Sequence, residues 1–285
     1  MIAASPTTTT AQRFVALAER IAARLREPRV RALHLPPPRP AAARDAEFCA
    51  LELDDGSIGF SYVLQDGVAP ALWAGAGVPA LAGAAAAAVA GGYAGSDALA
   101  RALGFAAINA LSQALFTRAG FTPPPAGDSL AGIAPDRGEH VGMVGLFPPL
   151  VAPVLAAGAR LTVLELDPAL AGERDGYRVT LDPAAIASCD RVVSTCTVLL
   201  NDTLDAVLAA CRRARRVVVI GPTAGCVPDP LFERGVDVVG GRRVTDARGF
   251  LDAFAAGERW GAFAAKYVIA RPDYPGVERL LERAA

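Results

Sequence analysis

The stretch His140-Val-Gly-Met-Val-Gly-Leu-Phe-Pro-Pro-Leu150 decides the fold of the chain. Its apolar residues, with Gly142 and Gly145 among them, predict a buried strand that ends in a tight turn. Pro148 and Pro149 suit the first turn of a following helix, because no backbone donor is needed there. Such a turn points backbone N–H groups and the positive end of a helix dipole at whatever lies above it. The pattern therefore predicts a strand–turn–helix unit with a ligand at the carboxyl end of its strand.

A second apolar run, Arg160-Leu-Thr-Val-Leu-Glu-Leu-Asp167, ends in the acids Glu165 and Asp167. In βαβ units that bind dinucleotides, an acid at this place holds ribose hydroxyl groups. The three-glycine fingerprint of those units is missing, because the turn here reads Gly145-Leu-Phe-Pro148. We expect a ligand at this end of the sheet without a pyrophosphate cradle. The alternative is a glycine turn that only lets the helix pack closely on the strand.

Composition limits the class of protein. The 285 residues, 53% hydrophobic and 20% charged, suffice for two domains and a sizeable core. A net charge of −1 gives no electrostatic reason to expect nucleic acid or an acidic membrane surface as a partner. The uncharged stretch 67–96 is mostly Ala and Gly and contains Pro70 and Pro79, so we expect no membrane insertion.

Five cysteines without CxxC spacing favour a reduced, cytoplasmic protein. A homodimer is compatible with the sequence, which does not decide the oligomeric state.

Residues 1–120 predict a small α+β domain. Two strand-like runs, 47–53 and 57–64, are joined by Asp54-Asp55-Gly56, which suits a hairpin turn. Around them the patterns predict helices at 10–26, 80–90 and 96–116 and an extended connector at 34–40. Residues 121–138, which contain Pro123-Pro-Pro125 and several glycines, predict the linker.

Residues 139–285 alternate between strand and helix patterns. Strands are predicted at 140–145, 161–166, 176–181, 190–195, 216–221, 236–239 and 267–270. Helices are predicted at 149–157, 183–188, 202–212, 229–234 and 246–256. Nearly continuous apolar strands such as Val217-Val-Val-Ile220 are typical of a parallel sheet that is covered on both faces. The prediction is an α/β protein whose C-terminal part is a Rossmann-like, doubly wound parallel sheet.

Ligands of such sheets bind outside the carboxyl ends of the strands, so candidate residues follow from the strand ends. Asn109 is added because an amide inside an apolar helix must find partners. The candidate ligand-binding residues are Gly145, Phe147, Pro148, Glu165, Asp167, Thr195, Thr197, Asn201, Thr223 and Asn109. Helix capping and turn formation account for Thr and Asn at these places equally well, and Asn109 has the alternative of bonding a neighbouring loop.

Two cysteines, Cys196 and Cys226, fall at the same predicted end of the sheet. A helix start next to a thiol lowers its pKa and favours the thiolate that binds soft metals. The pair is therefore a hypothetical metal site. The alternative is two small loop residues that never meet. His140 lies at the opposite end of its strand and is expected to be structural.

Several motifs together resemble the family described as putative heavy-metal chelation. They are Gly142-Met-Val-Gly-Leu-Phe-Pro-Pro149, Ser194-Thr-Cys-Thr-Val-Leu-Leu-Asn-Asp-Thr-Leu204, Gly221-Pro-Thr223, Leu231-Phe-Glu-Arg-Gly-Val-Asp237, Asp55-Gly-Ser-Ile-Gly-Phe60 and Gly104-Phe-Ala-Ala-Ile-Asn-Ala110. The resemblance implies a domain similar to the enolase N-terminal domain, followed by a Rossmann-like domain, with a site between them.

Two classes of function remain open from the sequence. The first is a binding protein that holds a heavy metal ion or a small metal chelate in the cleft between the domains, with Cys196, Cys226 and Asp167 as candidate ligands. The second is a small-molecule transferase or cyclase that uses S-adenosylmethionine or a nucleotide held by the acids after the second strand. No general base, nucleophile or catalytic triad stands out, so catalytic residues stay unknown and the cofactor is undetermined.

Overall fold

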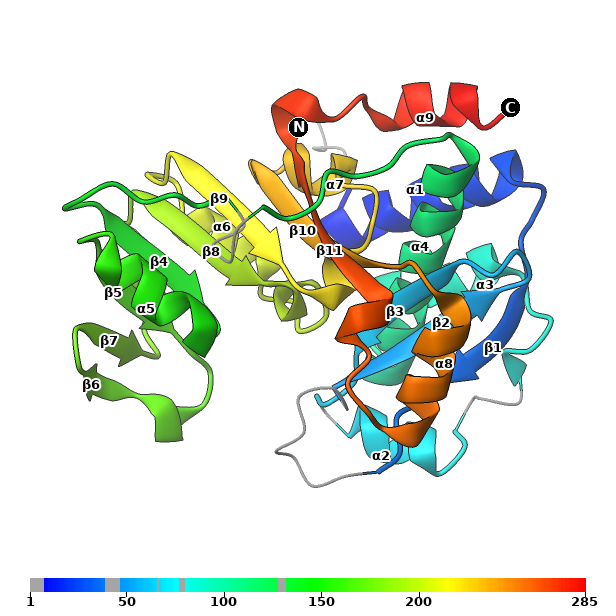
Figure 1. The fold of residues 1–285 in the computed structure, drawn as a ribbon, viewed down its shortest axis with the longest axis horizontal. Coiled ribbons are helices and arrows are strands. Elements are labelled where there is room, and N and C mark those ends of the chain that lie inside the picture. Colours follow the sequence, from blue (N-terminus) through cyan, green and yellow to red (C-terminus); the bar gives the residue numbers. More distant parts are fainter. Residues whose placement is uncertain (1–7, 39–46, 66, 77–79, 128–131) are drawn as a thin grey trace, which may run out of the picture.

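The computed structural model describes residues 8–38, 47–65, 67–76, 80–127 and 132–285. It contains a mostly parallel eight-stranded sheet and a separate three-stranded antiparallel sheet, as Figure 1 shows. The parallel sheet extends from β6 and β7 at one side of the molecule to β10 and β11 beside the small sheet. The predicted α/β class, with two different sheets, is confirmed.

The large sheet has the strand order β11-β10-β9-β8-β4-β5-β7-β6. Its strands are β4 (His140–Val144), β5 (Arg160–Leu164), β6 (Gly172–Arg174), β7 (Tyr177–Thr180), β8 (Arg191–Thr195), β9 (Arg216–Ile220), β10 (Val238–Val244) and β11 (Ala264–Ala270). The six inner strands are parallel, and the outer strands β6 and β11 are antiparallel to their neighbours. The chain runs outward from β4 in both directions, so the switch point of a doubly wound sheet lies between β4 and β8.

Helices and short 3-10 turns connect these strands. They are α5 (Pro148–Ala156), η4 (Pro168–Leu170), η5 (Pro183–Ile186), η6 (Cys196–Leu199), α6 (Leu204–Ala210), η7 (Pro222–Ala224), α7 (Asp229–Phe232), α8 (Ala247–Ala256), η8 (Gly261–Phe263), η9 (Arg271–Asp273) and α9 (Val277–Arg283). The predicted helix at 183–188 is only a 3-10 turn, and that at 202–212 begins two residues later. Asp182 and Asn201 hydrogen-bond to backbone N–H groups two residues ahead, which favours turns over a longer helix.

The N-terminal part of the chain forms the small sheet and the helices on one of its faces. Its elements are α1 (Thr10–Arg24), β1 (Val30–His34), β2 (Phe48–Leu53), β3 (Ile58–Tyr62), α2 (Val68–Trp73), α3 (Ala86–Gly91), η3 (Gly92–Ala94) and α4 (Ala98–Arg118). The hairpin at Asp54-Asp55-Gly56 is confirmed, with Gly56 at φ +85°. Strand β1 was not predicted, and the predicted helix at 80–90 begins only at Ala86.

Helix α4 is the core helix of this part. Between Arg101 and Phe116 every residue is buried. It packs on β3 so closely that a Cβ atom at Gly59 would lie 2.2 Å from the backbone nitrogen of Ala110. By length and composition α4 would suit a membrane, but 89% of its apolar window is buried inside the fold, as in a core helix.

Helix α8 differs from its expected place. A doubly wound fold predicts that it covers the parallel sheet, but it packs on the small sheet instead. Its Phe250 and Phe254 form an aromatic cluster with Phe60 of β3 and Trp260. The small sheet is thus covered by α4 on one face and by α8 on the other, so two segments far apart in sequence share one core. The predicted division at residues 120 and 139 stays a prediction.

Candidate functional site

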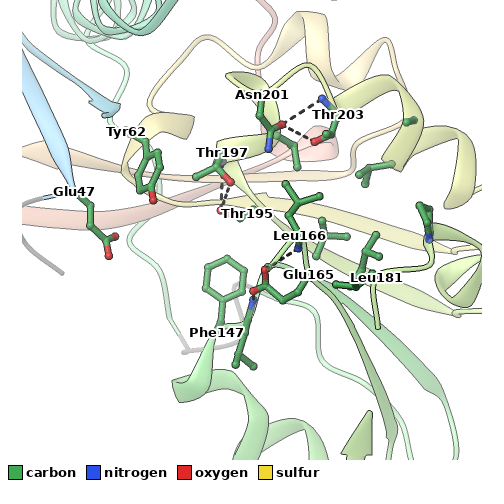
Figure 2. Close-up of a pocket in the computed structure, with 18 of the residues that line it drawn as sticks. Glu47, Tyr62, Phe147, Glu165, Leu166, Leu181, Thr195, Thr197, Asn201 and Thr203 are labelled. Atoms are coloured by element: carbon green, nitrogen blue, oxygen red, sulfur yellow. Dashed lines mark hydrogen bonds between the residues drawn. The ribbon is translucent and has the colours of Figure 1, made fainter. Parts of the chain in front are cut away.

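A cavity of about 540 Å³ lies at the switch point of the large sheet, where the carboxyl ends of β4, β5 and β8 meet residues of the small sheet. Figure 2 shows its polar side chains. The lining residues are Glu47, Tyr62, Val144, Gly145, Leu146, Phe147, Pro148, Pro149, Leu164, Glu165, Leu166, Leu181, Pro183, Thr195, Thr197, Val198, Asn201, Thr203, Ala206 and Val207. Its volume is that of a site for a small molecule.

The glycine turn after β4 has the predicted backbone conformation. Gly145 has φ +80°, and a Cβ atom there would lie 3.0 Å from the side chain of Thr195 on β8. Helix α5 then begins with Pro148 and Pro149, as predicted. Glycine is needed here both for the positive φ and for the close approach of the neighbouring strand end.

The turn does not, however, offer the free N–H groups that the sequence pattern predicted. Pro148 and Pro149 have none. The N–H of Leu146 donates to Glu165 Oε1 at 2.5 Å, and that of Phe147 points at the sulfur of Met143 at 3.3 Å. The two N–H groups of this turn that the sequence pattern expected to be unpaired therefore have partners inside the protein, and the two prolines supply no further donors.

Glu165 takes the place that an anionic ligand would occupy. Its second carboxylate oxygen accepts a hydrogen bond from the N–H of Leu166 at 3.2 Å, so one oxygen binds the turn after β4 and the other binds the backbone that follows Glu165. A carboxylate next to a helix start is stabilised by the helix dipole. The acid at the end of β5 makes the cavity negative.

A second carboxylate reaches the cavity from the other half of the chain. Glu47 lies directly before β2, and Tyr62 ends β3, so both come from the small sheet. Burial raises the pKa of the Tyr62 phenol, and the negative charges of Glu47 and Glu165 raise it further. In the view of Figure 2, Phe147 lies between the two acids, and Tyr62 lies on the same side as Glu47. Among the described lining residues there is no Lys, Arg or His.

The end of β8 contributes hydroxyl and amide groups. Thr195 caps the η6 turn through Thr197, whose hydroxyl also donates to Thr195 Oγ1 at 3.2 Å. The carbonyl oxygen of the Asn201 side chain accepts hydrogen bonds from the Thr203 backbone N–H and hydroxyl at 3.2 and 2.6 Å. Capping therefore explains these side chains in part, yet all four also line the cavity.

Most of the predicted ligand-binding residues come together in this cavity, and three do not. Asp167 is exposed and caps the following turn through the N–H of Ala169. Asn109 and Thr223 are fully buried. The Asn109 amide donates to the carbonyls of Phe60 and Thr223 at 2.7 Å each, and Thr223 Oγ1 accepts from the N–H of Tyr62. These two residues join the small sheet to the loop after β9, which is the alternative that the sequence left open for Asn109.

The cysteines do not have the thiolate character that the helix-start argument predicted. Burial raises the pKa of Cys196 to about 11, outweighing its hydrogen bonds to Thr223, and raises that of Cys226 further. Desolvation wins because both thiols are completely enclosed and η6 is a single 3-10 turn. Over the part of the chain that the structure describes, no three His, Cys, Asp or Glu residues form a cluster suited to a metal ion. The Cys196 and Cys226 pair stays an untested prediction.

Glu47, Tyr62, Leu166 and Leu181 were not predicted to be site residues. Leu166 and Leu181 are large apolar side chains that are 72% and 43% exposed at the cavity. The sequence could have indicated Leu166 as a site residue, because it is an apolar residue between the acids Glu165 and Asp167. No local pattern marks Glu47 or Tyr62, because their place depends on how the small sheet docks.

Comparison with models of protein families shows to which family the chain belongs. A family model described as "putative heavy-metal chelation" matches residues 130–271, and a second model with the same description matches residues 46–112. The chain belongs to this family. The two matched segments contain every described residue that lines the cavity.

Two solved structures, both titled as proteins of unknown function from the DUF364 family, have the same fold. The protein from Desulfitobacterium hafniense is 23% identical, with a TM-score of 0.65 over 90% of this chain and 98% of its own. The protein from Pyrococcus horikoshii is 21% identical, with a TM-score of 0.70 over 92% of this chain and 100% of its own. No curated protein matches the chain. The similarity to enolase implied by the sequence stays a prediction.

Proposed function

We propose that the protein binds a small, positively charged ligand, a metal ion carried as a small chelate, in the cavity at the switch point. The single observation that carries the proposal is the charge of this cavity. Glu165 and Glu47 line it from different halves of the chain, with no basic side chain among the described lining residues. The Glu165 carboxylate at this partly enclosed surface attracts a cation and repels phosphate.

A chelate suits the cavity better than a bare ion. Both Glu165 oxygens already accept backbone hydrogen bonds, and no cluster of three protein ligands surrounds an ion position in the described residues. A chelate brings its own ligands and needs only outer contacts with carboxylate, hydroxyl and amide groups. Leu146, Phe147 and Leu166 would pack against its organic part.

Hexaamminecobalt(III) is the probe for this proposal, because its ligands do not exchange and it binds only through outer contacts. We expect one complex per chain by titration calorimetry. Glu165→Gln should weaken binding about tenfold, as expected for loss of one charge-assisted hydrogen-bonding group. Glu173→Gln is the matched control, since Glu173 is an exposed acid in the same sheet outside the cavity. Unchanged affinity in Glu165→Gln would refute the proposed site.

The cysteine pair is tested separately with Cd²⁺, which prefers thiolates. We expect Cys196→Ser combined with Cys226→Ser to leave the binding of hexaamminecobalt(III) unchanged. If Cd²⁺ binds the wild-type protein, loses its site in the double variant and ignores Glu165→Gln, the metal site lies at the thiols and not in the cavity.

A second candidate is a ligand with an adenosine part, such as S-adenosylmethionine. One observation favours it: Glu165 ends β5 beside the Gly145 turn, which is the place of a ribose-binding acid in related sheets. S-adenosylmethionine has no phosphate and carries positive charge, so the blocked helix start does not oppose it. Displacement of hexaamminecobalt(III) by S-adenosylmethionine, but not by ATP, would favour this candidate.

A further inference from the structure

A second cavity adjoins the first, and its described lining contains two basic residues as well as the acid Glu47. It has a volume of about 380 Å³ and shares Glu47, Phe147 and Pro149 with the acidic cavity. Arg242 and Lys266 are its basic residues.

These two cations lie side by side on neighbouring strands. Arg242 of β10 is directly opposite Lys266 of β11 in the antiparallel register, so both side chains project from the same face of the sheet. Arg242 is held in place by a hydrogen bond to the carbonyl of Ala264 at 2.8 Å and by the ring of Trp260, 5.1 Å away.

Phe147 connects the two cavities. It is half-buried at the start of α5, and it lines both the acidic and the basic cavity. A ligand that reaches from Glu165 to Arg242 therefore passes an aromatic ring and the apolar residues beside it. Such a path favours an apolar link between two charged ends.

From this arrangement we infer that the ligand is amphoteric: its cationic centre binds at Glu165, and a free carboxylate on the same molecule reaches Arg242 and Lys266. The inference rests on the proposed function and adds the chemical class of the ligand. Free phosphate or a second cation would match only one of the two cavities. A metal chelate with a carboxylate that is not used in coordination matches both.

Two inert cobalt complexes test the inference directly. The pentaamminecobalt(III) complexes of hexanoate and of adipate have similar lengths, but only the adipate complex ends in a free carboxylate. The adipate complex carries less positive charge, so attraction by the acidic cavity alone predicts weaker binding. We expect it instead to bind about tenfold more tightly than the hexanoate complex, through charge-assisted hydrogen bonds to the two cations.

Arg242→Gln and Lys266→Gln should each abolish the preference for adipate and leave the affinity for hexanoate within twofold. Lys266 is exposed, so its substitution does not disturb the core, and a result from this variant stands even if Arg242→Gln fails to fold. Arg243→Gln is the matched control. Arg243 is the next residue on β10 and lines a separate cavity with Gln113 and Thr117, so its loss should keep the preference.

Lys266 also provides a direct signal, because it is the only lysine in the chain. Acylation of its amine, located by peptide mass spectrometry, should be slowed by the adipate complex and not by the hexanoate complex. Equal affinities for the two complexes, or equal labelling of Lys266, would overturn the inference and leave the proposed function intact if both still depend on Glu165. If neither complex binds, the inference is overturned, and the proposed function fails with it only if hexaamminecobalt(III) does not bind either.

Discussion

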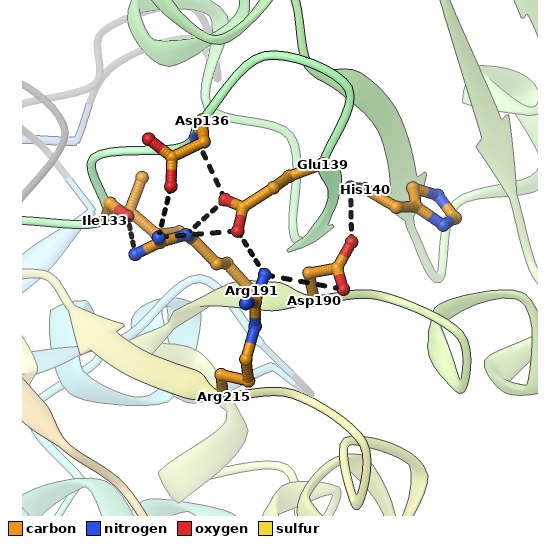
Figure 3. Close-up of polar contacts among 7 residues, drawn as sticks. All are labelled: Ile133, Asp136, Glu139, His140, Asp190, Arg191 and Arg215. Atoms are coloured by element: carbon orange, nitrogen blue, oxygen red, sulfur yellow. Dashed lines mark hydrogen bonds and ion pairs between the residues drawn. The ribbon is translucent and has the colours of Figure 1, made fainter.

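The two ends of the parallel sheet use charge in opposite ways. At the amino end, Glu139 lies directly before β4 and forms ion pairs with Arg191 of β8 and with Arg215, which precedes β9, as Figure 3 shows. At the carboxyl end, Glu165 and Glu47 share a cavity that has no basic residue in its described lining. Opposite charges that meet inside the protein stabilise it, whereas like charges around a cavity leave attraction for a ligand. This difference is the basis for proposing a structural role for the amino end and a binding role for the carboxyl end.

The amino end is closed by a continuous network. Arg191 donates to Glu139 at 2.5 Å and to the carbonyl of Ile133 at 3.0 Å, and it pairs with Asp136 at 3.3 Å. Asp190 accepts from the N–H of His140 at 2.8 Å. His140 itself contacts Thr162, and burial lowers its pKa, so the structural role predicted for it agrees with its place.

The largest expected effect is on stability, from Glu139→Gln. Glu139 has a side chain that is 9% exposed and binds two arginines. Removing its charge leaves Arg191 without its main partner, and we expect a loss of about 3 kcal/mol in the free energy of unfolding. Urea denaturation measures it, and the affinity for hexaamminecobalt(III) is the control, which should not change. A loss below about 0.5 kcal/mol, the range of ordinary surface changes, would contradict the structural role of this end.

Asn109→Ala tests whether every polar residue near the carboxyl end serves the ligand. The variant leaves the buried carbonyls of Phe60 and Thr223 without their donor. We expect a loss of about 2 kcal/mol in unfolding free energy, the cost of unsatisfied buried groups. The affinity for hexaamminecobalt(III) in the folded variant should change less than twofold. A large loss of affinity without loss of stability would return Asn109 to the ligand site.

The contribution of Glu139 to the free energy of unfolding should depend on pH. The hydrogen bond from Arg191 lowers the pKa of Glu139 below its ordinary value of 4.5. A carboxyl with a depressed pKa stabilises the folded state above its unfolded pKa, and this stabilisation disappears as pH falls through the folded pKa. The stability difference between wild type and Glu139→Gln should therefore be constant above pH 4.5 and narrow below it. Urea denaturation from pH 7 to pH 3 measures this, and widening on acidification would contradict the assignment.

The smallest expected effect is at Thr197. Thr197→Val keeps the shape and removes the hydroxyl that faces Thr195 in the cavity. We expect a change of about 0.5 kcal/mol in the binding free energy of hexaamminecobalt(III), roughly twofold in affinity, with stability unchanged. Calorimetry on the variant and on Thr203→Val, also in the lining, measures it. A tenfold loss in either would mean that a hydroxyl, and not Glu165, dominates binding.

Much of the fold was predictable because it rests on local patterns. The inner strands of the large sheet were predicted near their observed positions, and the Gly145 turn and the hairpin at Gly56 have the backbone that their residues require. The shifted start of α6 and the missed β1 depend on turn hydrogen bonds and on pairing with β2, which the sequence pattern does not encode.

Only the part of the candidate site that the parallel sheet supplies was predictable from the sequence. The strand-end rule brings Gly145, Glu165, Thr195 and Asn201 together, because parallel strands deliver their carboxyl ends to one end of a sheet. It could not find Glu47 or Tyr62, which reach the cavity from another sheet, nor exclude Thr223, whose hydroxyl turns toward the backbone of Tyr62.

The sequence by itself determined the strands of the parallel sheet, the Gly145 turn and the acid at the end of β5, because periodicity and turn chemistry act over a few residues. Only the tertiary structure decided which charges neighbour one another. Burial raises the pKa of Cys196. The Glu165 carboxylate accepts the backbone N–H group before α5, and α8 packs on the small sheet and not on the parallel sheet. Desolvation and charge pairing depend on everything that surrounds a group, and segments distant in sequence supply those surroundings.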